Sequence, residues 1–181
     1  MTRRHGLWIA AFAVSAGLAA SSTAALAQDK LKLAVGQRGL WDTSVSEVGQ
    51  RASIFKKHGL ELEILWTQGA GETQQAVISG SLDTLQKRKA AVERYMAAYR
   101  ETVDAMYSDP AVLKIYAEFA GISEAKAKRT RDDFFAKSAV NPDDIKGLDV
   151  IVPQAVTPKF TPAPLTKEQL AELIQIPPRK K

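Results

Sequence analysis

The stretch that decides the fold is LKLAVGQRGLWDTSVSEVGQRASIFKKHGLELEILW, residues 31–66. It begins with an alternating segment, 31–35, that is typical of a strand. It ends with a second one, 60–66, in which apolar and acidic residues alternate until the last three positions. Between them, residues 45–55 carry apolar side chains at helical spacing. Strand, helix and strand in this order predict a βαβ unit with two adjacent parallel strands.

Local signals predict the ends of the helix between these strands. Ser44 stands where an N-cap is expected, and Glu47 follows three residues later, which is the pattern of a capping box. Gly59 comes after His58 and is free to take the left-handed conformation that ends many helices. We therefore predict one helix from Ser44 to His58, with the His58 side chain capping its last carbonyl groups or meeting its dipole.

A glycine-rich turn follows the second strand. Residues 69–71, Gly-Ala-Gly, form the turn, and residues 72–79 are predicted as a helix that covers the strand pair. Residues 81–84 are typical of the lead-in to a third strand, which we expect because parallel sheets have more than two strands and cover on both faces. The polar and mostly basic run 86–89 interrupts this pattern. The α/β character of the first half therefore breaks near Leu85.

The second half of the chain is predicted to be helical. The first helix should bury a face made of Val92, Tyr95, Met96, Tyr99, Val103, Met106 and Tyr107. If part of this face stays exposed, it would drive self-association through apolar surface.

Further helix starts are predicted from caps. They are Asp109-Pro110, Ser123, Asn141-Pro142, and Thr166 with Gln169 in a capping box. Gly121 should end the first of these helices, and the second should reach Lys137. Pro153 should kink or end the helix in which it lies.

The first 27 residues have the three-part pattern of a secretory signal peptide. Arg3 and Arg4 are basic, residues 7–20 are apolar, and 25–27 read Ala-Leu-Ala. We predict cleavage after Ala27 and a periplasmic location; an uncleaved anchor is the alternative, although the apolar run is short for a membrane span. No Cys follows the run, so attachment to a lipid through Cys is excluded.

Composition excludes several kinds of chemistry. The chain has no Cys and two His, at positions 5 and 58. Disulfides and thiol chemistry are excluded, and one His beyond the leader argues against a zinc site or a His-based triad. The net charge is +5, but the basic runs 87–89 and 179–181 are short and contain no aromatic residue, so nucleic-acid binding is not predicted. We predict no enzyme activity, no metal and no cofactor.

Two blocks of sequence resemble a known family. The first holds GLWD at 39–42, IFKKHGLELEI at 54–64 and GAGETQQAVISGSLD at 69–83. It is similar to the start of periplasmic substrate-binding proteins of ABC transporters, of the nitrate, sulfonate and taurine group. The second block, from YRETVDAMYSDPAVLKIYAEFAGIS at 99–123 to PLTKEQLAELIQIP at 164–177, is similar to the end of such proteins.

The resemblance implies a type II periplasmic-binding-protein fold, in which two α/β lobes enclose a small solute. Between Asp83 and about Lys87 the family has the rest of the first sheet and most of the second lobe, ~100–150 residues by ordinary domain size. We therefore expect an internally truncated member: a signal peptide at 1–27, a partial lobe with a short parallel sheet at 28–85, and a helical segment at 86–181. Its implied role is to capture a small anionic solute and deliver it to a membrane permease, impaired by the deletion.

Six residues are predicted to contact the solute. Gln37, Trp41 and Asp42 follow the first strand, where open α/β sheets bind ligands. Trp41 would stack on a flat ligand or, alternatively, pack its loop onto the rest of the lobe. Trp66, at the end of the second strand, should lie in the core. The other three are Gly71, Glu72 and Thr73, which the resemblance places at the cleft. They begin a predicted helix whose free N–H groups favour an anion. The alternative is a plain turn between strand and helix.

Two further functions stay open on the sequence. The chain could be a secreted interaction module, in which residues 86–176 form a helical bundle and the βαβ segment is an appendage. An enzyme on the same scaffold is suggested by the pyrimidine-synthesis branch of the resembling family. That branch depends on cofactor and His chemistry, which a single His does not support.

Overall fold

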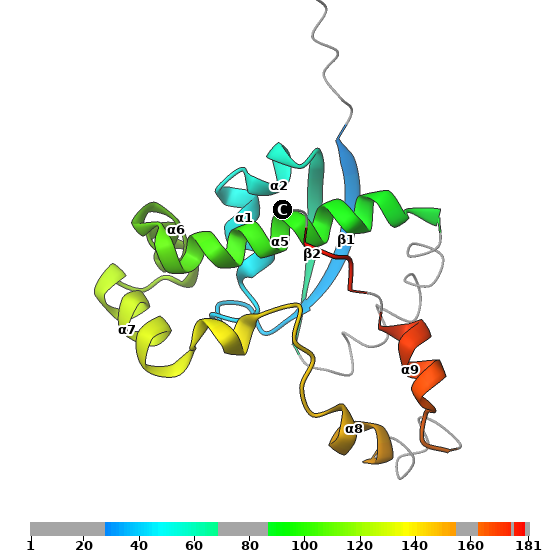
Figure 1. The fold of residues 1–181 in the computed structure, drawn as a ribbon. Helices are drawn as coiled ribbons and strands as arrows, with labels where there is room; N and C mark the ends of the chain where they lie inside the picture. Colours follow the sequence, from blue (N-terminus) through cyan, green and yellow to red (C-terminus); the bar gives the residue numbers. More distant parts are fainter. Residues whose placement is uncertain (1–27, 69–86, 155–162, 175, 180–181) are drawn as a thin grey trace, which may run out of the picture.

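The computed structural model describes residues 28–68, 87–154, 163–174 and 176–179. They form a mixed α/β structure, with a short parallel sheet and a helical second half (Figure 1). The elements are β1 Asp29–Gly36, α1 Val45–Arg51, α2 Ile54–Lys57, β2 Leu60–Thr67, α5 Lys89–Ser108, α6 Pro110–Ala120, α7 Glu124–Phe134, the 3-10 helix η1 Lys137–Val140, α8 Leu148–Gln154 and α9 Lys167–Leu173. The predicted α/β class is confirmed.

β1 and β2 pair in parallel, as the βαβ pattern predicts. The register runs from Asp29 opposite Leu60 to Gly36 opposite Thr67, so both strands end at the same edge. The predicted helix at 72–79 and the lead-in to a third strand lie outside the described residues. Within the described part, the sheet therefore consists of these two strands.

Alternation in the two strands separates an apolar face from a charged one. Leu31 and Leu62 are buried against α2 and α5. On the other face, Lys and Glu side chains stand opposite one another and form cross-strand ion pairs at 3.6 Å, with more than half of each side chain exposed: Lys30–Glu61 and Lys32–Glu63. We expected cover on both faces, but the charges that alternate with the leucines keep these positions in water.

The single helix predicted from Ser44 to His58 is wrong in two details. The helix breaks after α1, because Ser53 takes a left-handed conformation at φ 60°. Ser44 itself has a helical conformation and makes no side-chain cap; its hydroxyl donates to the Leu40 carbonyl. An N-cap hydroxyl reaches the N3 amide from an extended backbone, so the capping box cannot form. Gly59, at φ 69°, ends α2 as predicted.

The His58 side chain also departs from the prediction. Its Nε2 lies 2.8 Å from Oε2 of Glu101 on α5, and Lys57 Nζ donates to Oε1 of the same carboxylate at 2.7 Å. The ring therefore pairs with α5 rather than with the last carbonyl groups of α2. These hydrogen bonds, from Lys57 first and then His58, hold the pKa of Glu101 below its usual value.

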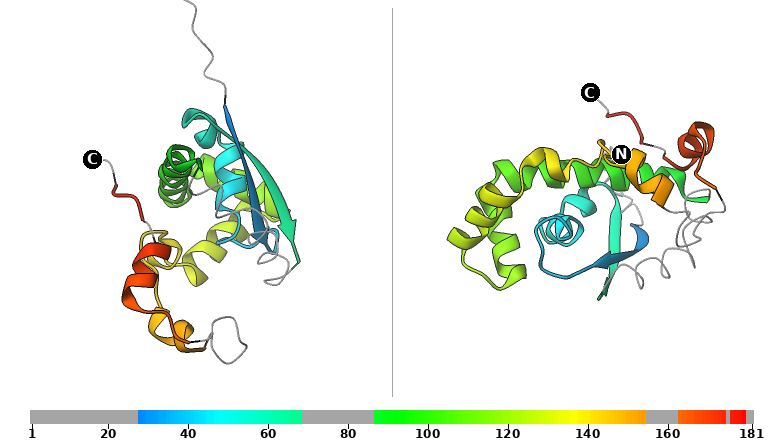
Figure 2. Two further views of the ribbon diagram at one scale, coloured as in Figure 1. Left: turned by 90° about the vertical axis from the view of Figure 1, so that its right-hand side faces the viewer. Right: turned by 90° about the horizontal axis from the view of Figure 1, so that it is seen from below.

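α5 packs along α1, α2 and β2, and Figure 2 shows this arrangement from two further sides. Of its predicted apolar face, Val103 and Met106 are buried, and the other five side chains are half-buried. One apolar cluster joins Trp41 and Val48 to this helix and to α6, and a second joins β1, β2 and α2 to Ala98. Both clusters thus contain side chains from both halves of the chain.

Most of the predicted caps in the helical half are confirmed. Asp109 accepts a hydrogen bond from the Ala111 amide, with Pro110 as the first helical residue. Ser123 caps α7 through the Lys126 amide, and the capping box at Thr166 is complete. Gly121 ends α6 at φ 67°.

The helix start at Asn141-Pro142 is wrong, because the Asn141 side chain accepts from the Asp143 amide and forms a turn instead. The next helix, α8, is described from Leu148 to Gln154 and contains Pro153. α7 ends at Phe134, short of Lys137.

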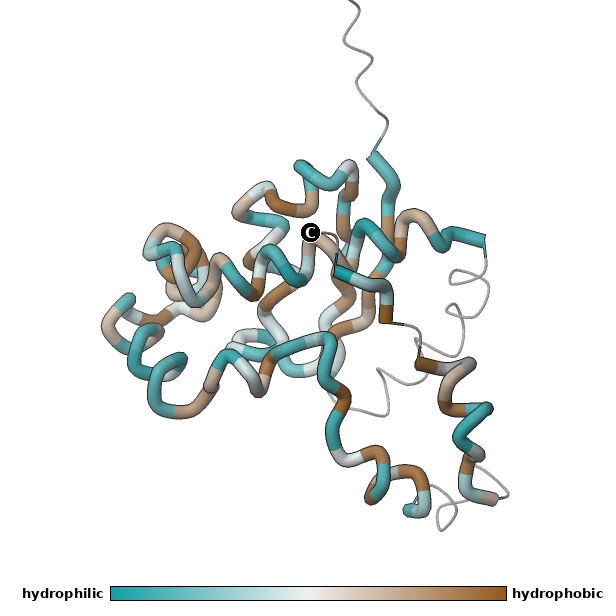
Figure 3. Tube along the Cα trace, in the orientation of Figure 1, coloured by the Kyte–Doolittle hydropathy of each residue, from teal (hydrophilic) through white to brown (hydrophobic). Residues whose placement is uncertain are grey.

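α8 and α9 lie apart from the sheet and carry apolar residues of their own (Figures 1 and 3). Self-association stays a prediction, and the large apolar side chains that the structure exposes are Leu40, Leu65, Phe134, Ile145, Val150 and Ile176. Within the ranges described above, no helix combines the length and apolar character needed to cross a bilayer.

Gly49→Ala should destabilise the fold. A Cβ at this position would lie 2.6 Å from a ring carbon of Phe55 and closer still to Thr102 Oγ1. Overpacking of this kind costs about 1–3 kcal/mol. Urea unfolding measures the loss, and Gly59→Asn is the control, because position 59 has open space and Asn tolerates its left-handed backbone. Equal stability of Gly49→Ala and the unaltered protein would contradict this packing.

Glu101→Gln should lower stability at pH 7 and have a progressively smaller effect as the pH falls. The folded pKa of Glu101 is depressed, so its contribution is present above the unfolded pKa and is lost as pH falls through the folded pKa. The carboxylate is partly exposed, so we expect less than about 1 kcal/mol. Unfolding free energies of both proteins between pH 3 and 7 measure the difference. A difference that does not change with pH would contradict the ion pair.

Candidate functional site

The loop after β1 lies at the edge where both strands end, and backbone contacts fix its position. Gln37 takes a left-handed conformation at φ 47°, and its amide donates to the Thr67 carbonyl at 3.0 Å. The Thr43 hydroxyl donates to the Gln37 carbonyl at 2.8 Å, and the Tyr116 hydroxyl donates to the Gly39 carbonyl at 3.2 Å. The loop is thus held between the end of β2 and α6.

Trp41 anchors this loop in the core. It is 1% exposed, and its Nε1 donates to the Tyr107 hydroxyl at 3.0 Å. Its ring meets Tyr107 and Tyr116 edge to face, with centroids 5.6 and 4.7 Å apart. Burial raises the pKa of both tyrosines. Of the two alternatives for Trp41, the structure shows the one in which it packs the loop onto the body.

The other predicted loop residues are exposed. The Gln37 and Asp42 side chains face solvent. Asp42 nevertheless affects its neighbours, since its charge adds to the effect of burial in raising the pKa of Tyr99 and Tyr116. The three remaining predicted residues lie outside the described part of the chain: Gly71, Glu72 and Thr73. The described structure therefore offers two of the six predicted contact residues to a solute at this edge.

An aromatic platform that the sequence did not predict lies beside the loop. Phe119, from the end of α6, is buried, and the Trp66 ring packs on it with centroids 5.5 Å apart. Two guanidinium groups lie over the same Phe119 ring: Cζ of Arg38 at 4.6 Å from the centroid and Cζ of Arg51 at 5.1 Å. The contacts join the β1 loop, α1, β2 and α6. Trp66 is half-buried against this ring and belongs to neither apolar cluster, so its predicted place in the core is wrong.

The two arginines differ in what else they bind. Arg51 Nε donates to Glu47 Oε1 at 2.7 Å, one turn earlier in α1. Arg38 makes no hydrogen bond or ion pair with the residues that the structure describes, and its contact is the aromatic ring. A guanidinium on an aromatic face keeps all its N–H groups free for hydrogen bonds in the ring plane. Arg38 is therefore a positioned cation that can bind a carboxylate, sulfonate or nitrate group.

Only part of this platform could have been predicted from the sequence. The position of Arg38 next to Gln37, in the loop after a strand, could have marked it as a candidate. Its partner Phe119 stands in another block of the chain and lies on an apolar helix face, so no local pattern joins the two. Among the residues with described positions, no three His, Asp or Glu side chains gather in a way that could hold a metal ion.

Comparison of the chain with protein-family models, with curated proteins and with solved structures finds no match.

Tyr107→Phe should destabilise the protein through the loop. The hydroxyl accepts from Trp41 and donates to the Phe135 carbonyl at 2.7 Å, so its removal leaves a buried indole N–H unpaired. Such a loss costs about 1–3 kcal/mol. Unfolding in urea, followed by tryptophan fluorescence, measures it. Tyr99→Phe is the matched control, because the Tyr99 hydroxyl makes no hydrogen bond to a described residue; equal losses in both variants would contradict the role of Tyr107.

Proposed function

We propose that this chain is a solute-binding protein of the ABC-importer type, which binds a small anionic solute at the carboxyl edge of β1 and β2. Arg38 carries the proposal. Its guanidinium rests on Phe119 at this edge without a carboxylate partner among the described residues, beside the exposed side chain of Gln37. A bidentate guanidinium and a neighbouring amide suit a planar or tetrahedral oxyanion.

The arrangement of the strands supports this location. Ligands of open α/β sheets bind outside the carboxyl ends of parallel strands, because loops from neighbouring strands converge there. The loop that carries Gln37 and Arg38 follows β1, and in the sequence Gly71, Glu72 and Thr73 follow the end of β2 closely. Free N–H groups at a helix start would add donors for the same anion.

The shared core indicates that both halves of the chain fold as one unit. It argues against a separate helical bundle to which the βαβ segment is only an appendage. Both apolar clusters combine residues from the first half, such as Trp41 and Leu31, with residues from the second half, such as Val103 and Ala98. The helices after Leu85 therefore shield the apolar face of the strand pair. An interaction module in which residues 86–176 fold by themselves would leave Leu31 and Leu62 without this cover.

The proposal keeps the finer expectations that come from the resemblance. These are a partial lobe of type II periplasmic-binding-protein character, secretion through residues 1–27, and delivery of the solute to a membrane permease. Of the two described cations at the strand edge, Arg51 is already paired with Glu47, so Arg38 is the one left for an anion. Binding from this one wall should therefore be weak and sensitive to salt, as expected for a truncated member.

Titration of the purified chain with methanesulfonate, nitrate and taurine tests the proposal. We expect saturable changes in the amide NMR signals of Gln37 and Arg38 with at least one of them. Arg38→Gln should weaken this binding about tenfold, equivalent to about 1.4 kcal/mol. Arg129→Gln is the matched control, because Arg129 is exposed on α7 and pairs with Asp133 away from the loop.

The outcomes separate two errors. If none of these anions gives a saturable response, solute binding by this chain is refuted. Binding that Arg38→Gln and Arg129→Gln weaken equally would show that the anion sits elsewhere than on the Phe119 platform.

A further inference from the structure

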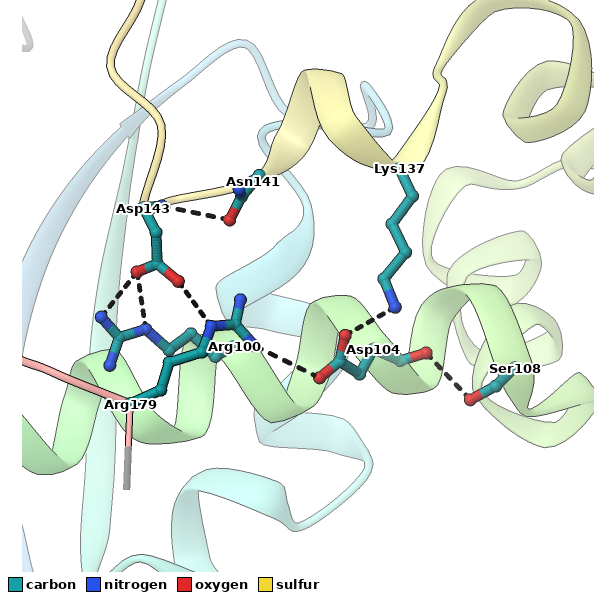
Figure 4. Close-up of polar contacts among 7 residues, drawn as sticks. All are labelled: Arg100, Asp104, Ser108, Lys137, Asn141, Asp143 and Arg179. Carbon is teal, nitrogen blue, oxygen red and sulfur yellow. Dashed lines mark hydrogen bonds and ion pairs between the residues drawn. The ribbon is translucent and has the colours of Figure 1, made fainter. Parts of the chain in front are cut away.

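Five charged side chains form an alternating ionic chain on another side of α5 (Figure 4). Asp143 is held between two arginines, with Oδ1 2.7 Å from Arg100 Nε and Oδ2 2.6 Å from Arg179 Nε. Asp104 is held between Arg179 and Lys137, with its Oδ1 2.6 Å from Lys137 Nζ and its Oδ2 3.8 Å from Arg179 Nη1. The order is Arg100, Asp143, Arg179, Asp104, Lys137, so a cation stands at each end.

One end of this ionic chain is buried and structural. Arg100 is 7% exposed, and its Nη2 also donates to the Pro177 carbonyl at 2.5 Å. Burial acts to raise the pKa of Asp143, but the hydrogen bonds from Arg100 and Arg179 outweigh it and hold the pKa below its usual value. This end fixes the C-terminal segment against α5.

The other end opens into a pocket of about 340 Å³. Its lining comes from α5, from η1 with the turn after it, and from the C-terminal segment: Val103, Asp104, Lys137, Ser138, Asn141 and Arg179. Half of the Lys137 and Arg179 side chains is exposed, 51% and 53%. Their charged groups are thus reachable from the pocket, unlike that of Arg100.

Most of the hydrogen-bonding groups left over at the pocket are donors. Asp143 accepts through both oxygens and Asp104 through Oδ1, while Asp104 Oδ2 makes, among the described residues, only the 3.8 Å ion-pair contact with Arg179. Asn141 Oδ1 accepts from the Asp143 amide at 3.2 Å. Within the described structure, Lys137 Nζ uses one of its three N–H groups. Three more groups have no described partner: Arg179 Nη2, Asn141 Nδ2 and the Ser138 hydroxyl. Three cations against two carboxylates also leave one positive charge in excess.

We propose that this pocket binds a small molecule through a singly charged carboxylate group. A carboxylate supplies the acceptors that Lys137, Ser138, Asn141 and Arg179 lack, and a single negative charge cancels the excess of the ionic chain. A doubly charged group would leave surplus negative charge beside Asp104. The pocket has room for more than the carboxylate alone, so the group is carried on a small polar molecule. The site shares no residue with the Phe119 platform, so it goes beyond the solute site proposed above.

The test uses acetate and lactate as probes on the purified chain, with phosphate for comparison. We expect saturable changes in the amide NMR signals of Ser138 and Asn141 with acetate and lactate, and weaker ones with phosphate. Lys137→Met should weaken the binding at least tenfold. Lys114→Met is the matched control, since Lys114 is exposed on α6 and takes part in no described ion pair. A second variant, Ser138→Ala, removes one neutral donor and should weaken binding a few-fold.

Circular dichroism checks that each variant is folded. If Lys137→Met does not fold, the binding measurement relies on Ser138→Ala. The proposal is overturned if neither probe gives a saturable change at Ser138 and Asn141, or if the tested pocket variant binds as tightly as Lys114→Met. Changes confined to Gln37 and Arg38 would also overturn it while leaving the strand-edge proposal intact. Tighter binding of phosphate than of either carboxylate would refute the inferred charge of the ligand.

Discussion

The structure depends most on the burial of Trp41. Its ring meets Tyr107 and Tyr116 edge to face, and its N–H donates to the Tyr107 hydroxyl, which in turn donates to the Phe135 carbonyl. This chain of contacts joins the loop after β1 to α5, to α6 and to the residue after α7. The strand-edge loop is therefore held by the helical half of the protein, and the position of Arg38 over Phe119 follows from the same packing.

The sequence predicts those parts of the fold that local chemistry determines. Alternation specified both strands, and the caps at Asp109, Ser123 and Thr166 formed because each needs only its own next three residues. Tertiary contacts decided the rest. Ser44 is buried and turns its hydroxyl back to Leu40, and Asn141 makes a turn beside an aspartate held by two arginines. A local pattern contains no information about such neighbours.

The same distinction applies to the candidate site. The end of a strand directed the prediction to the loop with Gln37 and Asp42, because parallel strands present their following loops at one edge, and the structure places both side chains in solvent there. The burial of Trp41 and the stacking of Arg38 depend on aromatic residues more than sixty positions away, on α5 and α6. The ionic chain of α5 likewise unites Arg100, Asp143 and Arg179, whose separation in sequence hides their proximity.

The charged face of the strand pair also limits how these molecules can pack together. Lys30 and Lys32 stand in one column and Glu61 and Glu63 in the next, with their side chains largely in water. An apolar layer placed on this face would strip hydration from four ions at once, a cost that their mutual attraction does not repay. Charged side chains, Lys above all, are also a common protection of exposed edge strands against pairing with other chains. Among the described residues, the charged part of this face therefore disfavours stacking of one sheet on another, while Leu65 is the apolar side chain exposed beyond it.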